Sequence, residues 1–295
     1  KINFIQKKTL KKNYSKLFKM IYNLDTSKFI FGYGLALFPL FLLLGPLISE
    51  VFLISIIFFS LFLIIKEKKY DFYLNKFAIF FLLFYLSTLY STISNFYNFD
   101  YSKGGLFFLR IPLFALSIWF VLDRYNIFNK KIILFFVILF LAIIFDSLVQ
   151  YYFDKNLLGY EVLNKSRISS FFRDEFILGS FLTRLIPIFL IYLIMEGLIN
   201  DKKIQKSYLL LISFACLIIY LSGERTAFGL LILFFFTLFF MVKLLRKFIL
   251  YLIIIFTVLA IILPSLKPSY RTDPVERIFQ KSFNQIIGKE KKEQE

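Results

Sequence analysis

Residues 176–199 read FILGSFLTRLIPIFLIYLIMEGLI, an apolar run that is interrupted by Arg184. About 20 apolar residues in a helix cross the hydrocarbon core of a bilayer, so this stretch predicts a transmembrane helix. A charge inside such a helix costs roughly 2.5–3.5 kcal/mol on insertion scales. A chain keeps one where the charge has a partner or a function, and Arg184 is therefore the first candidate functional residue.

Runs of this kind recur along the chain, which is 59% hydrophobic and has a mean hydropathy of +0.74. A soluble domain would need a more polar surface. The runs lack the alternation of membrane β-strands, so we predict an all-α, polytopic integral membrane protein. Nine spans are predicted, at residues 29–49, 50–65, 77–94, 105–122, 132–149, 176–198, 207–223, 226–242 and 248–266.

Lysine and arginine are unevenly distributed over the predicted loops. Alternate loops, beginning with residues 1–28, hold 21 of them, whereas the loops on the other side hold about six before the C-terminal tail. Because basic loops stay in the cytoplasm, the N-terminus is predicted to be cytoplasmic and the C-terminal segment periplasmic. The net charge of +17 is then mostly a topology signal, and we expect no nucleic-acid partner.

Three regions follow from this topology. They are a basic cytoplasmic segment at 1–28, a transmembrane helical domain at 29–266 with a long outer loop at 150–175, and the start of a periplasmic loop at 267–295. In the last region Asp273, Pro274 and Gly288 are residue types preferred at helix ends. They frame a predicted amphipathic helix at about 274–287 that lies on or near the outer membrane surface.

Missing residue types narrow the chemistry. The sequence has no histidine, which excludes a histidine-based metal site or general base within these residues. Its single cysteine, Cys216, lies in an apolar run, so no intrachain disulfide can form. We therefore expect neither a metal ion nor another cofactor.

The few charged residues in or at the ends of the spans all fall in the outer half of the membrane. They are Glu50, Arg110, Asp146, Arg184, Glu224 and Arg225. Charges confined to one leaflet predict a polar cavity that opens to the outside. If the sixth span begins near Arg173, then Arg173, Ser180 and Arg184 lie within about 40° of one another on one helix face. Two arginines and a hydroxyl would then form a ladder, with Arg167 a few residues upstream.

Arginine is the residue expected at a phosphate site, because its guanidinium group offers two parallel donors. Arg225 stands at the outer start of the span 226–242, so a cavity lined by these arginines suits a lipid-linked phosphate or diphosphate. Structural interpretations stay open beside this one. Arg184 could pair with Asp146, Arg225 with Glu224, and Arg173 could reach the lipid headgroups.

The chain contains, in order, DSLVQYY at 146–152, RISSFFRDEFILGSFLTRLIP at 167–187 and LSGERTA at 221–227. Over about residues 29–290 this order resembles the O-antigen ligase and polymerase family of bacterial envelopes. The resemblance implies a helical fold in the bacterial inner (cytoplasmic) membrane that is similar to the C-type glycosyltransferases. It implies transfer of a glycan from an undecaprenyl-diphosphate carrier, on the periplasmic face, to lipid A-core or, in polymerases, to another carrier-linked glycan.

The resemblance also assigns roles and partners. It implies that Arg225 is catalytic, that Arg167, Arg173, Arg184 and Arg225 hold the diphosphate, and that Asp146, Glu224 and Ser180 support them. The partners would be the lipid-linked glycan, its acceptor and membrane lipids. The family's periplasmic loop with its histidine would follow near residue 295, so we expect a fragment without the catalytic loop. The alternative is a divergent member that has no histidine.

Two hypotheses of other classes compete with this lipopolysaccharide-biosynthesis enzyme. A membrane transporter or flippase of a lipid-linked phosphate would need polar residues along the whole path and often has internal repeats. This sequence has polar groups only in the predicted outer half, and no repeat. A purely structural membrane scaffold would leave Arg184 unexplained. The sequence therefore favours the glycosyltransferase.

Overall fold

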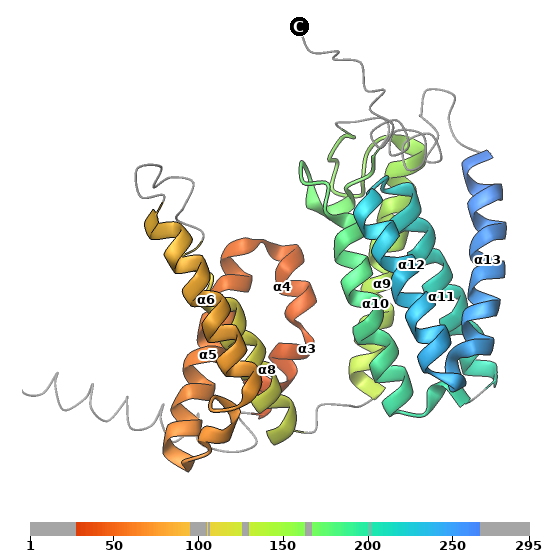
Figure 1. The fold of residues 1–295 in the computed structure, drawn as a ribbon. Helices are drawn as coiled ribbons and strands as arrows, with labels where there is room; N and C mark the ends of the chain where they lie inside the picture. Colours follow the sequence, from red (N-terminus) through yellow and green to blue (C-terminus); the bar gives the residue numbers. More distant parts are fainter. Residues whose placement is uncertain are drawn as a thin grey trace, which may run out of the picture. The chain divides into compact units, whose positions relative to one another are not determined.

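The computed structural model describes residues 28–94, 105, 107–125, 130–162, 167–200 and 202–265. In these residues every regular element is a helix (Figure 1). Five segments among them are long and apolar enough to cross a membrane: α5 (Pro46–Glu67), α6 (Lys76–Ser94), α9 (Lys130–Phe153), α10 (Leu178–Met195) and Lys243–Leu263. By the length and composition of these helices the chain is a membrane protein. The predictions for residues 1–27 and for 267–295, with its helix at 274–287, lie outside the described residues.

The chain divides into two compact units, Lys1–Ile127 and Phe128–Glu295. The described helices of the first unit are η1 (Lys28–Tyr33), α3 (Gly34–Ala36), α4 (Phe38–Leu44), α5, η2 (Tyr70–Phe72), α6 and α8 (Arg110–Arg124). The last of these is shorter than the span predicted at 105–122, because the helix begins only at Arg110.

The first two predicted spans, 29–49 and 50–65, are wrong in their boundary. The helix is interrupted at Gly45, whose φ of 128° is an angle that glycine adopts without strain. Pro46 is then the first residue of α5. Ser49 and Glu50 therefore belong to α5, and the residues before the break form a π-helical turn and two short helices. The sequence contained the glycine–proline signal, but the continuous hydropathy on both sides of it concealed the break.

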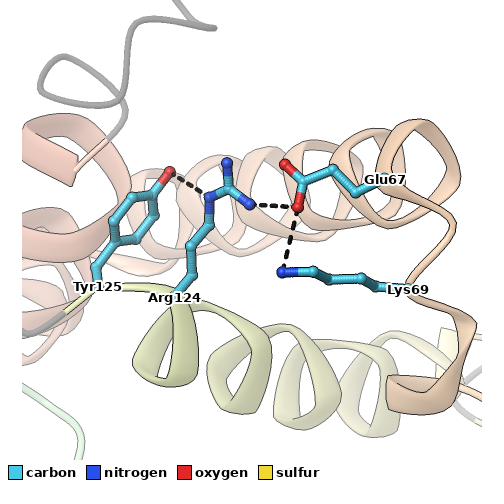
Figure 2. A network of polar contacts seen from close by, with 4 residues as sticks. All are labelled: Glu67, Lys69, Arg124 and Tyr125. Carbon is cyan, nitrogen blue, oxygen red and sulfur yellow. Dashed lines mark hydrogen bonds and ion pairs between the residues drawn. The ribbon is translucent and has the colours of Figure 1, made fainter.

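Helices α5 and α8 pack in parallel and are held at both ends by ion pairs. Glu50 lies 3.0 Å from Arg110 at their starts, and Glu67 lies 2.6 Å from Arg124 at their ends. Figure 2 shows the second pair with Lys69, which lies 3.5 Å from Glu67, and with the Tyr125 hydroxyl, which accepts from Arg124 Nε. Glu50 and Arg110, two of the charges predicted to lie in the outer half, are thus partners of each other.

The second unit contains α9, η4 (Ser170–Phe172), α10, η5 (Leu198–Asn200), α11 (Lys202–Leu221), α12 (Arg225–Met241), η6 (Lys243–Leu245) and α13 (Arg246–Ser265). Helix α11 is its centre, in contact with α9, α10, α12 and α13 (Figure 1). Its residues 215–221 are all buried, and Cys216 among them is a free thiol. Exposed apolar side chains lie on the outer helices, as expected of surfaces that face lipid.

Candidate anion site at the starts of α10 and α12

Glu224 is a buried carboxylate that caps α10 from another part of the chain. Its Oε1 accepts the backbone N–H of Gly179 at 2.6 Å, and its Oε2 accepts the N–H and the hydroxyl of Ser180 at 3.0 and 2.7 Å. N–H groups in the first turn of a helix have no partner within the helix, and a negative charge is stabilised there. Glu224 therefore fixes the start of α12 against the start of α10.

The stretch around Glu224 is shaped for this contact. Gly223, with a φ of 68°, turns the chain between α11 and α12. On the α10 side, a Cβ added to Gly179 would lie 2.6 Å from Ser222 Oγ and 3.1 Å from Glu224 Oε1. Position 179 must therefore be glycine for the carboxylate to reach the helix.

Two arginines lie around this carboxylate. Arg225 is the first residue of α12 and half-buried. Arg167, in the loop before α10, stacks its guanidinium 4.6 Å from the ring centroid of Phe176. Burial lowers the pKa of Arg167, the nearby Glu224 charge raises that pKa, and the nearby Arg225 charge lowers it. The charges of Glu224 and Arg225 thus both act on the guanidinium of Arg167.

Both oxygens of the Glu224 carboxylate already accept hydrogen bonds from α10, and the charges of Glu224 and Arg225 both act on Arg167. Arg167 Nε is buried and has no hydrogen-bond partner in the described part of the protein. A buried donor without a partner is costly. This arrangement can accept an anion with several oxygens.

Asp146 belongs to a buried polar group that anchors the outer loop. Its Oδ1 accepts the N–H of Leu157 at 2.8 Å and its Oδ2 accepts the hydroxyl of Ser170 at 2.5 Å. One turn further along α9, Gln150 Oε1 accepts the N–H groups of Ser169 and Ser170 at 2.9 and 2.7 Å. The end of α9 therefore fixes the loop that carries Arg167.

Sequence reasoning assigned no role in this anchor to Gln150 or to Asn156. Asn156 is buried and donates to the carbonyl of Ser170 at 3.0 Å, closing the loop on itself. A signal for Gln150 was present, because a residue four positions after Asp146 lies on the same face of a helix. Nothing comparable marks Asn156, whose partner is 14 residues away.

The predicted ladder of Arg173, Ser180 and Arg184 is wrong at its first member. Helix α10 begins at Leu178, where the Glu224 cap meets it, so Arg173 precedes the helix. Arg173 adopts a φ of 53° in a turn, is exposed, and places its guanidinium 4.8 Å from the ring centroid of Tyr160. Only Ser180 and Arg184 remain one turn apart on α10.

Arg184 is exposed, although Thr183 before it and Leu185 after it are buried. It forms no ion pair with Asp146, whose oxygens accept the loop donors named above. The carboxylate of Glu224 is directed to α10, whose N–H groups its two oxygens accept. The structure thus brings Arg167, Ser180, Glu224 and Arg225 together and leaves Arg173 on the Tyr160 ring.

An apolar groove lies along α12, starting one turn after Arg225. It has a volume of about 530 Å³ and lies between α12 and α13, with Cys216 of α11 in its wall. Phe228, Leu231 and Phe235 contribute from α12, and Ile249 and Phe256 from α13. An arginine at a helix start, followed by an apolar groove on the same helix, has the polarity of a lipid-binding surface.

No group of three His, Cys, Asp or Glu side chains in the described residues could hold a metal ion. No family model, curated protein or solved structure matches the chain. The function therefore has to be argued from the chemistry of the site.

Proposed function

We propose that this protein is a glycosyltransferase of the O-antigen ligase or polymerase type in the inner membrane of a bacterium. It moves a glycan from an undecaprenyl-diphosphate carrier to lipid A-core or to another carrier-linked glycan. The ligase and polymerase reactions have the same donor chemistry and differ in the acceptor. In this proposal the chain crosses the membrane nine times, with a cytoplasmic N-terminus and a periplasmic site.

The observation that carries the proposal is the guanidinium of Arg167, whose buried Nε has no hydrogen-bond partner among the described residues and on which the charge of Arg225 acts. Arg167 and Arg225 both lie near the Glu224 carboxylate, and its oxygens already accept bonds from Gly179 and Ser180. A diphosphate is the anion that two guanidinium groups bind well, because each fork matches a pair of oxygens. The apolar groove along α12 gives the tail of a lipid carrier a surface next to its headgroup.

The chemical role of the arginines follows from charge development. The acceptor hydroxyl attacks C1 of the donor sugar, and the bond from C1 to the diphosphate oxygen breaks. The diphosphate leaves with the electron pair, and the hydroxyl proton ends on the released diphosphate or in water. Fixed positive groups next to the leaving oxygens stabilise the transition state more than the ground state, because negative charge grows there. Arg225 is proposed for this role, with Arg167 holding the diphosphate, and Arg184 and Arg173 at its approach.

Binding of undecaprenyl diphosphate to the purified protein in nanodiscs tests this proposal. Replacing Arg225 or Arg167 with alanine should weaken binding by roughly tenfold or more, since hydrogen bonds to charged groups are worth about 1.5–3 kcal/mol. Arg225→Lys should also weaken binding, because lysine loses the fork. Arg110→Ala is the control, because Arg110 pairs with Glu50 in the other unit. Unchanged affinity in Arg225→Ala at normal protein level would contradict the proposal.

A further inference from the structure

A second groove lies at the opposite ends of the helices, between the starts of α11 and α13. Its volume is about 880 Å³, within the range of about 300–1,000 Å³ that ligand sites have. Lys206 of α11 and Lys247 of α13 line it, and none of the described residues in its lining is acidic. The helices α11 and α13 pack side by side (Figure 1).

The wall of this groove changes from cationic to apolar along the helices. Lys206 is followed one turn later by Leu210, and Lys247 is followed at one-turn intervals by Tyr251 and Ile255. Residues four apart share a helix face, and eight residues rise about 12 Å along the axis. The positive charges therefore lie at one end and the apolar side chains extend from them toward the middle of the helices, which is the polarity of an amphiphile with an anionic head.

The two lysines are available to such a head. Within the described residues neither ammonium group makes an ion pair or a hydrogen bond. The adjacent Arg246, in contrast, donates to the carbonyls of Phe239 and Phe240 at 2.9 and 3.2 Å and so completes the end of α12. The N-terminal ends of α11 and α13 add partial positive charge at the same place.

We propose that this groove binds an anionic phospholipid of the membrane, with the lipid phosphate at Lys206 and Lys247 and an acyl chain along Leu210, Tyr251 and Ile255. Basic pockets between membrane-spanning helices are suited to anionic headgroups. Because the groove lies between the apolar helix α11 and α13, which belongs to a segment long and apolar enough to cross a membrane, the surrounding bilayer supplies the occupant. The lipid would join the start of α11 to the start of α13. This site is independent of glycan transfer.

The test measures lipid retention by native mass spectrometry on the full chain, with phosphatidylglycerol and phosphatidylcholine of identical acyl chains. The wild type should retain phosphatidylglycerol preferentially. The double variant Lys206→Gln/Lys247→Gln should lower that preference about 30-fold, because each lysine near an anionic lipid contributes roughly fivefold. The matched control is Lys130→Gln/Lys131→Gln, two exposed lysines at the start of α9 that do not line the groove.

A second variant tests the apolar part of the groove without changing its charge. Leu210→Trp places a larger side chain in the wall and should reduce retention of phosphatidylglycerol, while the thermal unfolding temperature in phosphatidylcholine stays near that of the wild type. Equal loss of preference in the groove and control double variants would overturn the proposal, because it would indicate only diffuse attraction. A wild type that retains both lipids equally would overturn it as well.

Discussion

The carboxylate of Glu224 accepts the N–H of Gly179, which lies 45 positions earlier in the chain. This contact organises the candidate site. The two carboxylate oxygens accept three donors at the start of α10, so the charge stabilises a helix end. Near this carboxylate, the buried Nε of Arg167 has no hydrogen-bond partner among the described residues. Glu224 also fixes the first turn of α10 and so excludes Arg173 from that helix.

Gly179 and Gly229 form a matched pair of helical glycines that tests the cap. A Cβ at 179 would lie 2.6 Å from Ser222 Oγ, whereas a Cβ at 229 would meet nothing within 4 Å. Gly179→Ala should destabilise the protein by about 1–3 kcal/mol through overpacking. Gly229→Ala should be neutral or stabilising by up to about 1 kcal/mol, because alanine favours helix. Thermal unfolding in detergent measures both, and equal unfolding temperatures would refute the close contact at Gly179.

Asp146 and Arg184 should behave as independent residues. Asp146→Asn should destabilise the loop by about 1–3 kcal/mol, because Leu157 or Ser170 loses a charged acceptor. Arg184→Gln should not restore what this change loses, and the coupling energy of the double variant should stay below about 0.5 kcal/mol. Chemical denaturation of the single and double variants measures the coupling. Rescue by the double variant would mean that the two side chains pair.

At the scale of elements, ion pairs hold α5 and α8 in parallel, and buried hydroxyls connect the helices between them. Ser60 donates to Ser117 at 2.6 Å, and the Tyr73 hydroxyl lies 2.9 Å from Ser117. Two parallel helices of this kind need a return segment, which α6 provides between them in the chain. Polar contacts of this type carry specificity in a membrane, where apolar surfaces give little preference for one helix over another.

Glu67 and Glu161 form a matched test of how much such an ion pair contributes. Glu67 lies 2.6 Å from Arg124, with side-chain exposures of 21% and 15%, whereas Glu161 lies 2.9 Å from Lys155 with exposures of 70% and 61%. Glu67→Gln should cost about 1.5–3 kcal/mol, and Glu161→Gln less than about 1 kcal/mol because water screens the exposed pair. Denaturation of both variants decides this, and similar costs would show that the Glu67 pair is also screened.

At the scale of the whole molecule, the structure consists of two helical units that together contain five segments able to cross a membrane. These counts concern the described residues. Each unit has its own buried contacts, and the polar groups of the candidate site all come from the second unit. The orientation of the chain in the membrane is the main whole-molecule prediction that follows from the loop charges.

Labelling with a membrane-impermeant maleimide tests that orientation. In a Cys216→Ala background, single cysteines at Tyr70 and Tyr160 should react from opposite sides of the membrane. The basic loop that contains Tyr70 is predicted to be cytoplasmic, and the outer loop that contains Tyr160 periplasmic. Reaction of position 160 from the cytoplasm would contradict both the topology and the periplasmic placement of Arg167 and Arg225.

The sequence by itself determined the helical class and the approximate position of most helices. The spans predicted at 77–94, 132–149, 226–242 and 248–266 lie within a few residues of α6, α9, α12 and α13, because hydropathy is a property of consecutive residues. The break at Gly45 was missed, because the apolar run continues on both sides of it. The start near Arg173 that the ladder required was also wrong, although the span predicted at 176–198 lies within a few residues of α10.

Only the tertiary structure decided which polar groups meet. Asp146 was a possible partner of Arg184 and Glu224 a possible partner of Arg225, but they bind the outer loop and the start of α10. These partners lie between 11 and 45 residues away in the chain. Sequence spacing predicts contacts within one helix, where the geometry is fixed, whereas contacts between helices depend on how the helices pack. The composition of the candidate site is for that reason a property of the fold.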